Sequence, residues 1–172
     1  MAKSTSDSLF DKLKYIRALV FDVDGVLTNG NMLMLGNGEL LRQMSFRDGF
    51  ALEYAIKKRY KICVISESGS EAIGKMLDAL GIKEVYFYAE SKLAALEKFV
   101  IDHEVDIHEI LYMGDDIPDL DCMKAVGIAV CPQDAVPEIK NISHYITSAN
   151  GGEGCVREVL EMVMKYHKFW DF

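Results

Sequence analysis

Short apolar runs alternate with helical patterns along most of the chain. The runs that predict strands are residues 16–21, 61–66, 84–88, 109–113, 127–130 and 144–147. Apolar positions at helical spacing predict helices over residues 48–59, 70–81, 92–103, 119–126 and 153–167. Continuous apolar strands separated by helices are typical of a parallel sheet that is covered on both faces. We therefore expect an α/β fold with a doubly wound parallel sheet.

Local signals place the ends of two of these helices. Asp48 stands where an N-cap would begin the helix over 48–59, and Gly81 would close the helix over 70–81. The sequence "GNGE" at 36–39 separates two apolar runs, which predicts a β-hairpin with a glycine turn after the first strand.

The predicted hairpin is apolar on both faces, because Met32, Leu33, Met34 and Leu35 follow one another directly. A lone two-stranded ribbon is marginal in water, so we expect this surface to be covered. A neighbouring subunit and the core of the same chain are both open as the covering surface.

Composition limits the class of protein. The chain has 172 residues, enough for one domain, which we place at 9–172 after a disordered terminus at 1–8. The net charge of −8 argues against nucleic-acid binding, which needs a basic face. The apolar runs are strand-sized and the start lacks an apolar signal segment, so we expect a cytoplasmic protein without a membrane span. The four cysteines are scattered without C-x-x-C spacing, which predicts buried, reduced thiols.

Chemically active side chains stand beside the ends of several predicted strands. Asp22 and Asp24 follow the first strand and Ser66 ends the next. Lys92 begins a helix, and "GDDIPD" follows the strand at 109–113 with Asp115, Asp116 and Asp119. In an open parallel sheet the carboxyl ends of the strands form the ligand-binding crevice. We therefore expect these side chains to face one pocket.

These residue types suit phosphoryl transfer. Asp22 and Asp115 are suitable oxygen ligands for Mg²⁺, which would offset their charge. A carboxylate can attack phosphorus, and a second acid two residues on can protonate the leaving oxygen and then activate water. A hydroxyl and a lysine would hold the phosphoryl oxygens.

Each motif alone has an ordinary structural interpretation. D-x-D-G occurs by chance, Ser66 alone resembles a helix cap, Lys92 alone a solvated helix start, and "GDDIPD" an acidic turn. The functional interpretation rests on their order and on their places beside strand ends. A receiver domain of a signalling pair also phosphorylates an aspartate on such a sheet. It should have a pair of acids near the start of the chain and the phosphorylated aspartate at a later strand end, and the order of Asp22-x-Asp24 and the later "GDD" fits phosphoryl transfer by Asp22 better.

The ordered motifs resemble those of the haloacid dehalogenase (HAD) superfamily. More narrowly, the chain is similar to the small capless phosphatases typified by 3-deoxy-D-manno-octulosonate (KDO) 8-phosphate phosphatase. The similarity covers nearly the whole chain, through "FDVDGVLTNG", "SFRDGFAL", "SKLAAL", "LYMGDDIPDLDCM", "VGIAVCPQDAVPEIK", "YIT" and "GGEGCVREV".

This resemblance implies roles for individual residues. Asp22 would be the nucleophile and Asp24 the general acid/base, with Ser66 and Lys92 as further catalytic groups. Mg²⁺ would be held by the Asp22 side chain, the Asp24 backbone carbonyl and Asp115. Asp116 would steer a metal-bound water or Lys92, with Asp119 beside it.

The resemblance also implies an assembly and a substrate. Family members are tetramers in which the hairpin, here about 30–45, packs on neighbours and roofs the adjacent active site in place of a cap. The expected substrate is KDO 8-phosphate or a close relative, contacted by Ser45, Phe46, Arg47, Asp48 and Gly49.

The chain departs from the family where the sugar acid would be recognised. Glu67 and Ser68 replace a usual Gly-Arg pair, and Glu53 and Met76 stand at helical positions where arginines are usual. Glu67 is similar to a Glu of 2-keto-3-deoxynononate 9-phosphate phosphatases, so such a 9-phosphate or an N-acylneuraminate 9-phosphate is an alternative substrate. The carboxylate of the substrate would then meet Arg47, Lys75 or a neighbour's Arg42.

Two further alternatives remain at this stage. A non-catalytic HAD module that assembles a sugar-nucleotide transferase is one, although such modules tend to lose motif acids. The aromatic tail with Phe169, Trp170 and Phe172 would either pack on its own core or dock on a neighbouring subunit.

Overall fold

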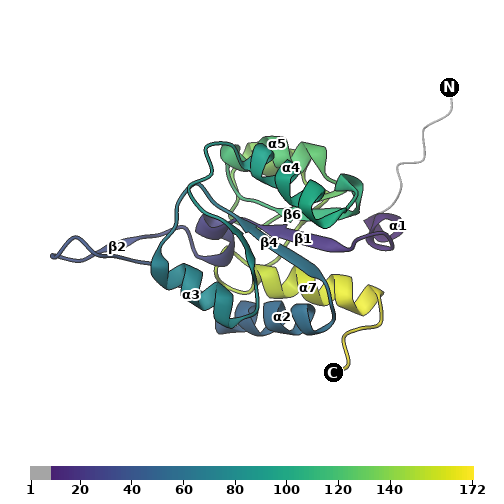
Figure 1. The fold of residues 1–172 in the computed structure, drawn as a ribbon, viewed down its shortest axis with the longest axis horizontal. Coiled ribbons are helices and arrows are strands. Elements are labelled where there is room, and N and C mark those ends of the chain that lie inside the picture. The colour runs from purple at the N-terminus through teal and green to yellow at the C-terminus, as the bar shows by residue number, and fades with distance from the viewer. Residues whose placement is uncertain (1–8) are drawn as a thin grey trace.

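The computed structural model describes residues 9–172, and the predicted disordered terminus at 1–8 lies outside the described residues. Its centre is a six-stranded parallel sheet in the order β5-β4-β1-β6-β7-β8 (Figure 1). The strands are β1 (Ala18–Phe21), β4 (Lys61–Ile65), β5 (Glu84–Tyr86), β6 (Ile110–Met113), β7 (Ile128–Cys131) and β8 (Tyr145–Ile146). The predicted doubly wound α/β fold is confirmed.

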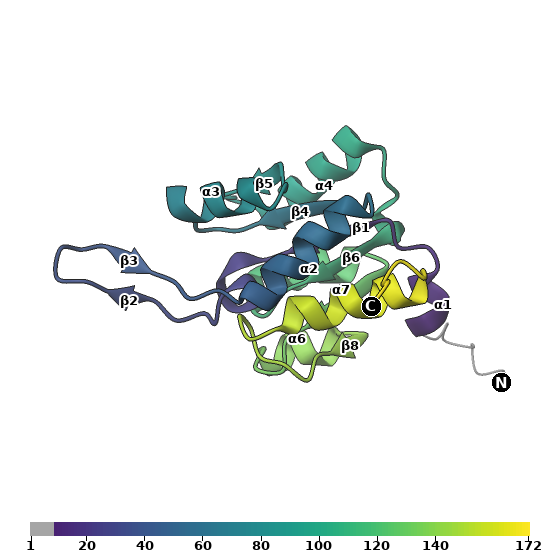
Figure 2. The same ribbon diagram turned by 90° about the horizontal axis from the view of Figure 1, so that it is seen from below.

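Helices cover both faces of the sheet (Figures 1 and 2). One face carries α2 (Phe46–Lys57), α3 (Glu71–Ala79) and α7 (Cys155–Tyr166), and the other carries α4 (Lys92–His103), α5 (Leu120–Ala125) and α6 (Pro137–Ile142). Short 3₁₀ turns, η2 (Ile107–Glu109) and η3 (Ile117–Asp119), precede β6 and α5. The short α1 (Leu9–Leu13) lies against α7 and β7.

The alternation of side chains along β1 explains the two cores. Leu19 and Phe21 pack into the core on the α2, α3 and α7 side, whereas Ala18 and Val20 pack into the opposite one. Successive side chains of a strand point to opposite faces, so a strand buried on both sides must be apolar at every position. Because β1 lies between β4 and β6, its carboxyl end opens at the middle of the sheet.

Helix α2 begins earlier than the sequence predicted. Its N-cap is Ser45, whose hydroxyl accepts a hydrogen bond from the Arg47 backbone N–H at 3.2 Å, so the prediction of Asp48 as N-cap is wrong. Asp48 instead accepts hydrogen bonds from the Gly154 N–H at 3.2 Å and the Arg157 N–H at 2.6 Å. Gly154 has no side chain to cap α7, so a carboxylate from α2 satisfies the N–H groups at its start.

The hairpin is formed by β2 (Leu33–Met34) and β3 (Leu40–Leu41) and extends away from the sheet (Figure 2). Its residues Met32, Leu33, Met34, Leu40 and Leu41 expose 43–73% of their surface. The alternative that the core of the same chain covers the hairpin is therefore wrong. At its neck, a bridge between Thr28 and Met44 joins the two legs.

The helical pattern of the sequence does not reveal two short helices. Helices α1 and α6 are five and six residues long, too short for a helical period to emerge.

The aromatic tail packs on its own chain, where Trp170 contacts the rings of Phe50 and Tyr54. All four cysteines are free and buried, as predicted. None of the helices within residues 9–172 is long and apolar enough to cross a bilayer.

Candidate active site

Asp22 stands where β1 ends and a tight turn begins. The turn is η1 (Val23–Leu27), and the Asp22 Oδ1 atom accepts a hydrogen bond from the Val23 N–H at 2.6 Å. Within the turn Gly25 has φ +89°, and a Cβ built there would lie 2.0 Å from Asp115 Oδ2. Glycine therefore serves two purposes here, since it permits the turn and admits the Asp115 carboxylate beside it.

Asp119 is fully buried at the site and makes more contacts there than the sequence analysis predicts. Its carboxylate accepts hydrogen bonds from Lys92 Nζ at 2.8 Å, from Tyr112 Oη at 2.7 Å and from the Asp115 N–H at 3.2 Å. Asp119 reaches this position because the chain turns into η3 only a few residues after β6 ends. Asp116 caps η3 through the Ile117 N–H at 2.7 Å, so Asp119 and not Asp116 steers Lys92.

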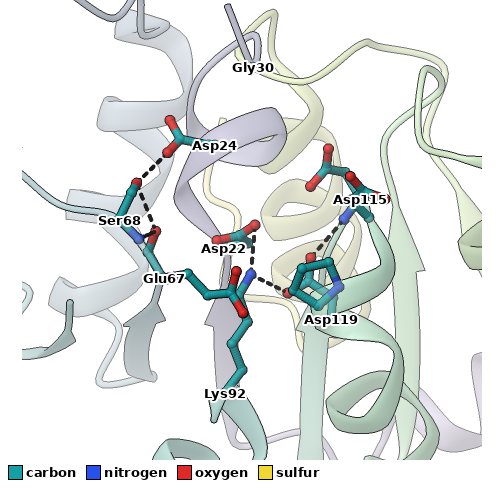
Figure 3. A pocket seen from close by; sticks show the side chains of 11 residues that line it. Asp22, Asp24, Gly30, Glu67, Ser68, Lys92, Asp115 and Asp119 are labelled. Carbon is teal, nitrogen blue, oxygen red and sulfur yellow. Dashed lines mark hydrogen bonds and ion pairs between the residues drawn. The ribbon is translucent and has the colours of Figure 1, made fainter. Parts of the chain in front are cut away.

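Lys92 is buried between two acids, not solvated at a helix start. Its Nζ lies 2.9 Å from Asp22 Oδ2 and 2.8 Å from Asp119 Oδ1, with 4% of the side chain exposed (Figure 3). Burial lowers the pKa of Lys92, but the charges of Asp119 and Asp22 outweigh it and raise the pKa above its ordinary value. Lys92 is therefore held as a cation.

Oxygen atoms of Asp22, Asp115 and Asp119 lie within 4.8 Å of one another. Burial, followed by the charge of Asp119, raises the pKa of Asp22, and the same two causes raise the pKa of Asp115 to about 7. A cluster of buried carboxylates with too little positive charge fits a hard cation with oxygen ligands. The metal site predicted at Asp22 and Asp115 thus has the required donor chemistry, with Asp119 as an additional oxygen group.

Ser66 follows β4, which pairs with β1 on the side opposite to β6, the strand that Asp115 follows. It is buried, and its hydroxyl accepts a hydrogen bond from the Ser68 N–H at 3.2 Å. The alternative that Ser66 caps a helix is wrong, because Ser70 is the N-cap of α3. Ser66 lines the pocket, which is the place that the phosphoryl-binding interpretation expects.

Asp24 is held by groups from two other segments. Arg42 donates from Nε to Asp24 Oδ1 at 2.7 Å and from a terminal nitrogen to Oδ2 at 3.3 Å. The Ser68 hydroxyl also donates to Asp24 Oδ2, as Figure 3 shows. Burial alone would raise the pKa of Asp24, but Arg42, Ser68 and Thr28 together lower it below its ordinary value. Arg42 and Ser68 were not assigned this contact from the sequence, because nothing local links position 42 to position 24.

The site opens as a pocket of about 300 Å³ at the carboxyl ends of the strands. Its described lining comprises Asp22, Asp24, Gly30, Ser66, Glu67, Ser68, Lys92, Asp115, Asp116, Pro118 and Asp119. All seven catalytic, metal and supporting residues predicted from the sequence are in this set. Lys92 is the one cation among these lining residues, against six carboxylates.

The predicted substrate contacts are divided. Glu67 lines the pocket, whereas the segment from Ser45 to Gly49 is absent from its described lining. Phe46 is 98% exposed, and Asp48 is 2% exposed with its carboxylate occupied by α7. In the single chain this segment serves the α2 start and the α2–α7 contact.

Comparison with known proteins agrees with this geometry. Residues 81–159 match the family of haloacid dehalogenase-like hydrolases. The KDO 8-phosphate phosphatase of Escherichia coli K12 is 31% identical over 159 residues, which cover 92% of this chain and 85% of that protein.

Solved structures of similar proteins have the same fold. The KDO 8-phosphate phosphatase of Yersinia pestis superposes with a TM-score of 0.92 at 29% identity, over 95% of this chain and 88% of that one. The enzyme of Moraxella catarrhalis, solved with magnesium, phosphate and KDO, gives 0.89 at 27% identity, over 93% and 92% of the two chains. The chain therefore belongs to the haloacid dehalogenase-like hydrolases, among the capless phosphatases typified by KDO 8-phosphate phosphatase.

Proposed function

We propose that this phosphatase hydrolyses a small phosphorylated sugar acid, KDO 8-phosphate or a close relative, with Mg²⁺ as cofactor and through a phospho-aspartate. The observation that carries the proposal is the placement of Lys92 against Asp22, with Asp115 and Asp119 completing an oxygen-lined cluster. The Mg²⁺-containing relative from Moraxella catarrhalis supports the choice of metal and of substrate class.

The chain supplies a group for each chemical step. An Asp22 oxygen attacks phosphorus and the bond from phosphorus to the leaving oxygen breaks. Asp24 enters this step in its protonated form and gives that oxygen its proton. Water then attacks the phosphorus of phospho-Asp22 and gives a proton to Asp24. The bond between phosphorus and the Asp22 oxygen breaks, so that inorganic phosphate leaves and Asp22 is restored. Lys92 and Ser66 bind phosphoryl oxygens and orient the group for in-line attack.

Asp22, the Asp24 backbone carbonyl and Asp115 would hold Mg²⁺. When bound, the ion would neutralise charge on the phosphoryl group and on the acids that surround it. This role agrees with the excess of carboxylates over cations in the pocket lining.

The test is the loss of one oxygen from the nucleophile. Asp22→Asn is expected to abolish turnover of a phosphate monoester in the presence of Mg²⁺, while thermal unfolding shows a folded protein. Retained turnover in Asp22→Asn would refute the nucleophile. Wild-type protein that hydrolyses no phosphate monoester would instead favour a non-catalytic module.

Substrate choice needs a direct comparison of 8-phosphate and 9-phosphate sugar acids. Glu67 lines the pocket and Arg42 is engaged with Asp24, which favours including 2-keto-3-deoxynononate and N-acylneuraminate 9-phosphates. Faster turnover of a 9-phosphate than of KDO 8-phosphate would move the assignment to that alternative. Equal, weak rates on all would remove sugar acids as the substrate class.

We extend the proposal to a homotetramer in which hairpins cover neighbouring sites. The support is the exposed apolar surface of β2 and β3, which a single chain leaves in contact with solvent. Met34→Lys is expected to lower the mass measured by light scattering and to reduce activity at the same protein concentration. An unchanged mass would contradict the hairpin contact.

A further inference from the structure

The neck of the hairpin contacts the proposed acid/base directly. Arg42 directly follows β3 and precedes the bridge between Thr28 and Met44, so its backbone is held where the legs of the hairpin meet. Only 8% of the Arg42 side chain is exposed, although most of the hairpin beyond it is open to solvent. Its burial therefore comes from the contact with the site and not from packing within the hairpin.

Arg42 and Ser68 contact the Asp24 carboxylate together. Arg42 donates to both carboxylate oxygens, and its terminal nitrogen also donates to the Ser68 hydroxyl at 3.2 Å. Ser68 in turn donates to Asp24 Oδ2. A two-pronged guanidinium contact fixes the plane of a carboxylate as well as its position. The three side chains form a closed set, in which each contacts the other two.

Arg42 is placed to orient Asp24 without lining the pocket itself. It is absent from the described lining of the pocket, whereas Asp24 and Ser68 both belong to it. Asp24 is only half-buried, and an ion pair that is partly open to water adds little net stability, because solvent screening and the cost of removing charge from water offset the attraction. The contact is better explained by the orientation that it imposes on Asp24.

We propose that Arg42 is a positioning residue which, with Ser68, fixes the Asp24 carboxylate for proton transfer to and from the reacting oxygens. The inference rests on the acid/base role assigned to Asp24 under the proposed function. It makes the neck of the hairpin part of the catalytic machinery of its own chain. The rest of the hairpin remains available to a neighbouring subunit.

The test separates proton transfer from attack on phosphorus. A sugar phosphate releases an alkoxide that needs a proton, whereas p-nitrophenyl phosphate releases a phenolate that leaves without one. In Arg42→Gln, kcat on the preferred sugar phosphate is expected to fall about 10- to 100-fold, with KM changed by less than about threefold. The single-turnover release of nitrophenolate, which reports formation of phospho-Asp22, is expected to fall by less than about threefold.

Matched variants distinguish positioning from a structural role. Arg42→Lys is expected to recover part of the loss, and Ser68→Ala to show the same substrate dependence with a smaller effect. Arg17→Gln, which removes an exposed arginine paired with Glu109, is expected to behave as wild type. Equal losses on both substrates, or no loss, would overturn the proposal. If Arg42→Gln does not fold, Arg42→Lys and Ser68→Ala decide the question by the same comparison.

A structural measurement keeps this inference separate from the proposed function. In crystals of Arg42→Gln, or of Ser68→Ala if the former does not fold, the Asp24 carboxylate is expected to move or to adopt several rotamers. An Asp24 side chain in its wild-type place would overturn the positioning role. Wild-type protein that cleaves neither substrate would refute the phosphatase proposal, while the crystals would still decide what holds Asp24.

Discussion

Lys92 Nζ and Asp119 Oδ1 lie 2.8 Å apart in a place where Asp119 has no exposed surface. The same nitrogen lies 2.9 Å from Asp22 Oδ2, so one cation is shared by two buried carboxylates. Removing one partner from such a group leaves uncompensated charge in the interior, which is far more costly than its net contribution to stability.

Lys92→Met is therefore expected to destabilise the fold by about 3–5 kcal/mol and to lower phosphatase activity at least about 100-fold. Added MgCl₂ should raise its thermal unfolding temperature more than that of wild type, because a divalent cation replaces the missing charge. Lys98→Met, which removes an exposed lysine paired with Asp102, is the control. Equal effects of MgCl₂ on the three proteins would contradict a shared charge site.

Gly25→Ala is expected to remove Mg²⁺-dependent activity, because a Cβ at this position would lie 2.0 Å from Asp115 Oδ2. Gly38→Ala provides the control for backbone strain. Gly38 has φ +84°, close to the +89° of Gly25, but nothing lies within 4 Å of its added Cβ. Both variants should lose about 1–2 kcal/mol through the left-handed conformation. Only Gly25→Ala should also lose Mg²⁺ binding, measured by calorimetry, and equal binding in the two variants would contradict this account.

Asp48 should make stability depend on pH. Burial raises its pKa to about 6 from an ordinary 3.8, although N–H groups of Arg157 and Gly154 and the charge of Arg157 lower it. A raised folded-state pKa in an acid means that the unfolded chain releases the proton first. The contribution of Asp48 to stability is therefore greatest below pH 3.8 and declines as the pH rises toward about 6.

The measurement is the free energy of unfolding of wild type minus that of Asp48→Asn across this range. The difference is expected to fall by about 3 kcal/mol, which corresponds to roughly two pKa units. Comparing the two proteins at each pH cancels the contributions of the other acids, and the Cys155 thiol beside Asp48 remains neutral because burial raises its pKa. A difference that does not change with pH would show that Asp48 is not buried against α7.

Trp170 should stabilise the chain without taking part in catalysis. Its ring lies 5.4 Å from that of Tyr54, and the Arg157 guanidinium carbon lies 4.5 Å from its centroid. Trp170→Ala is expected to cost about 1–3 kcal/mol through lost ring contacts and burial. The more exposed Phe172 provides a graded comparison, since Phe172→Ala should cost less.

Deletion of residues 168–172 should lower stability as Trp170→Ala does, and leave kcat, KM and oligomeric state unchanged. A change in oligomeric state after this deletion would instead favour docking of the tail on a neighbouring subunit. Light scattering and steady-state kinetics on the same preparations distinguish the two outcomes.

The sequence was sufficient for the sheet and for the acids at its edge, because both depend on local patterns. Apolar runs identify buried strands. Asp22 directly follows one of them and Asp115 follows another after a single glycine, and these two strands pair as neighbours. Long-range contacts were beyond such reasoning. The local pattern predicts Asp48 as the start of its own helix, whereas its carboxylate caps a helix more than a hundred residues later.

The same limit applies to Arg42 and Ser68. The sequence shows Ser68 only where relatives usually have an arginine, but its hydroxyl contacts Asp24, 44 positions away in the sequence. Arg42 reaches Asp24 only because the hairpin returns to its neck before α2 begins. No periodicity or local motif reports the direction in which a chain returns.

The close packing of glycines around η1 has a consequence for the order of assembly. A Cβ at Gly151 would lie 2.0 Å from the Gly25 carbonyl oxygen, and one at Gly152 would lie 2.4 Å from the Asn29 nitrogen. The loop that follows β8 therefore packs backbone against backbone on the turn that carries Asp24. During synthesis on the ribosome Asp22 and Asp24 are made early, but Gly151 and Gly152, which pack against their turn, are made near the end. A nascent chain that stops before residue 151 contains every proposed catalytic side chain but still lacks the loop that packs against η1.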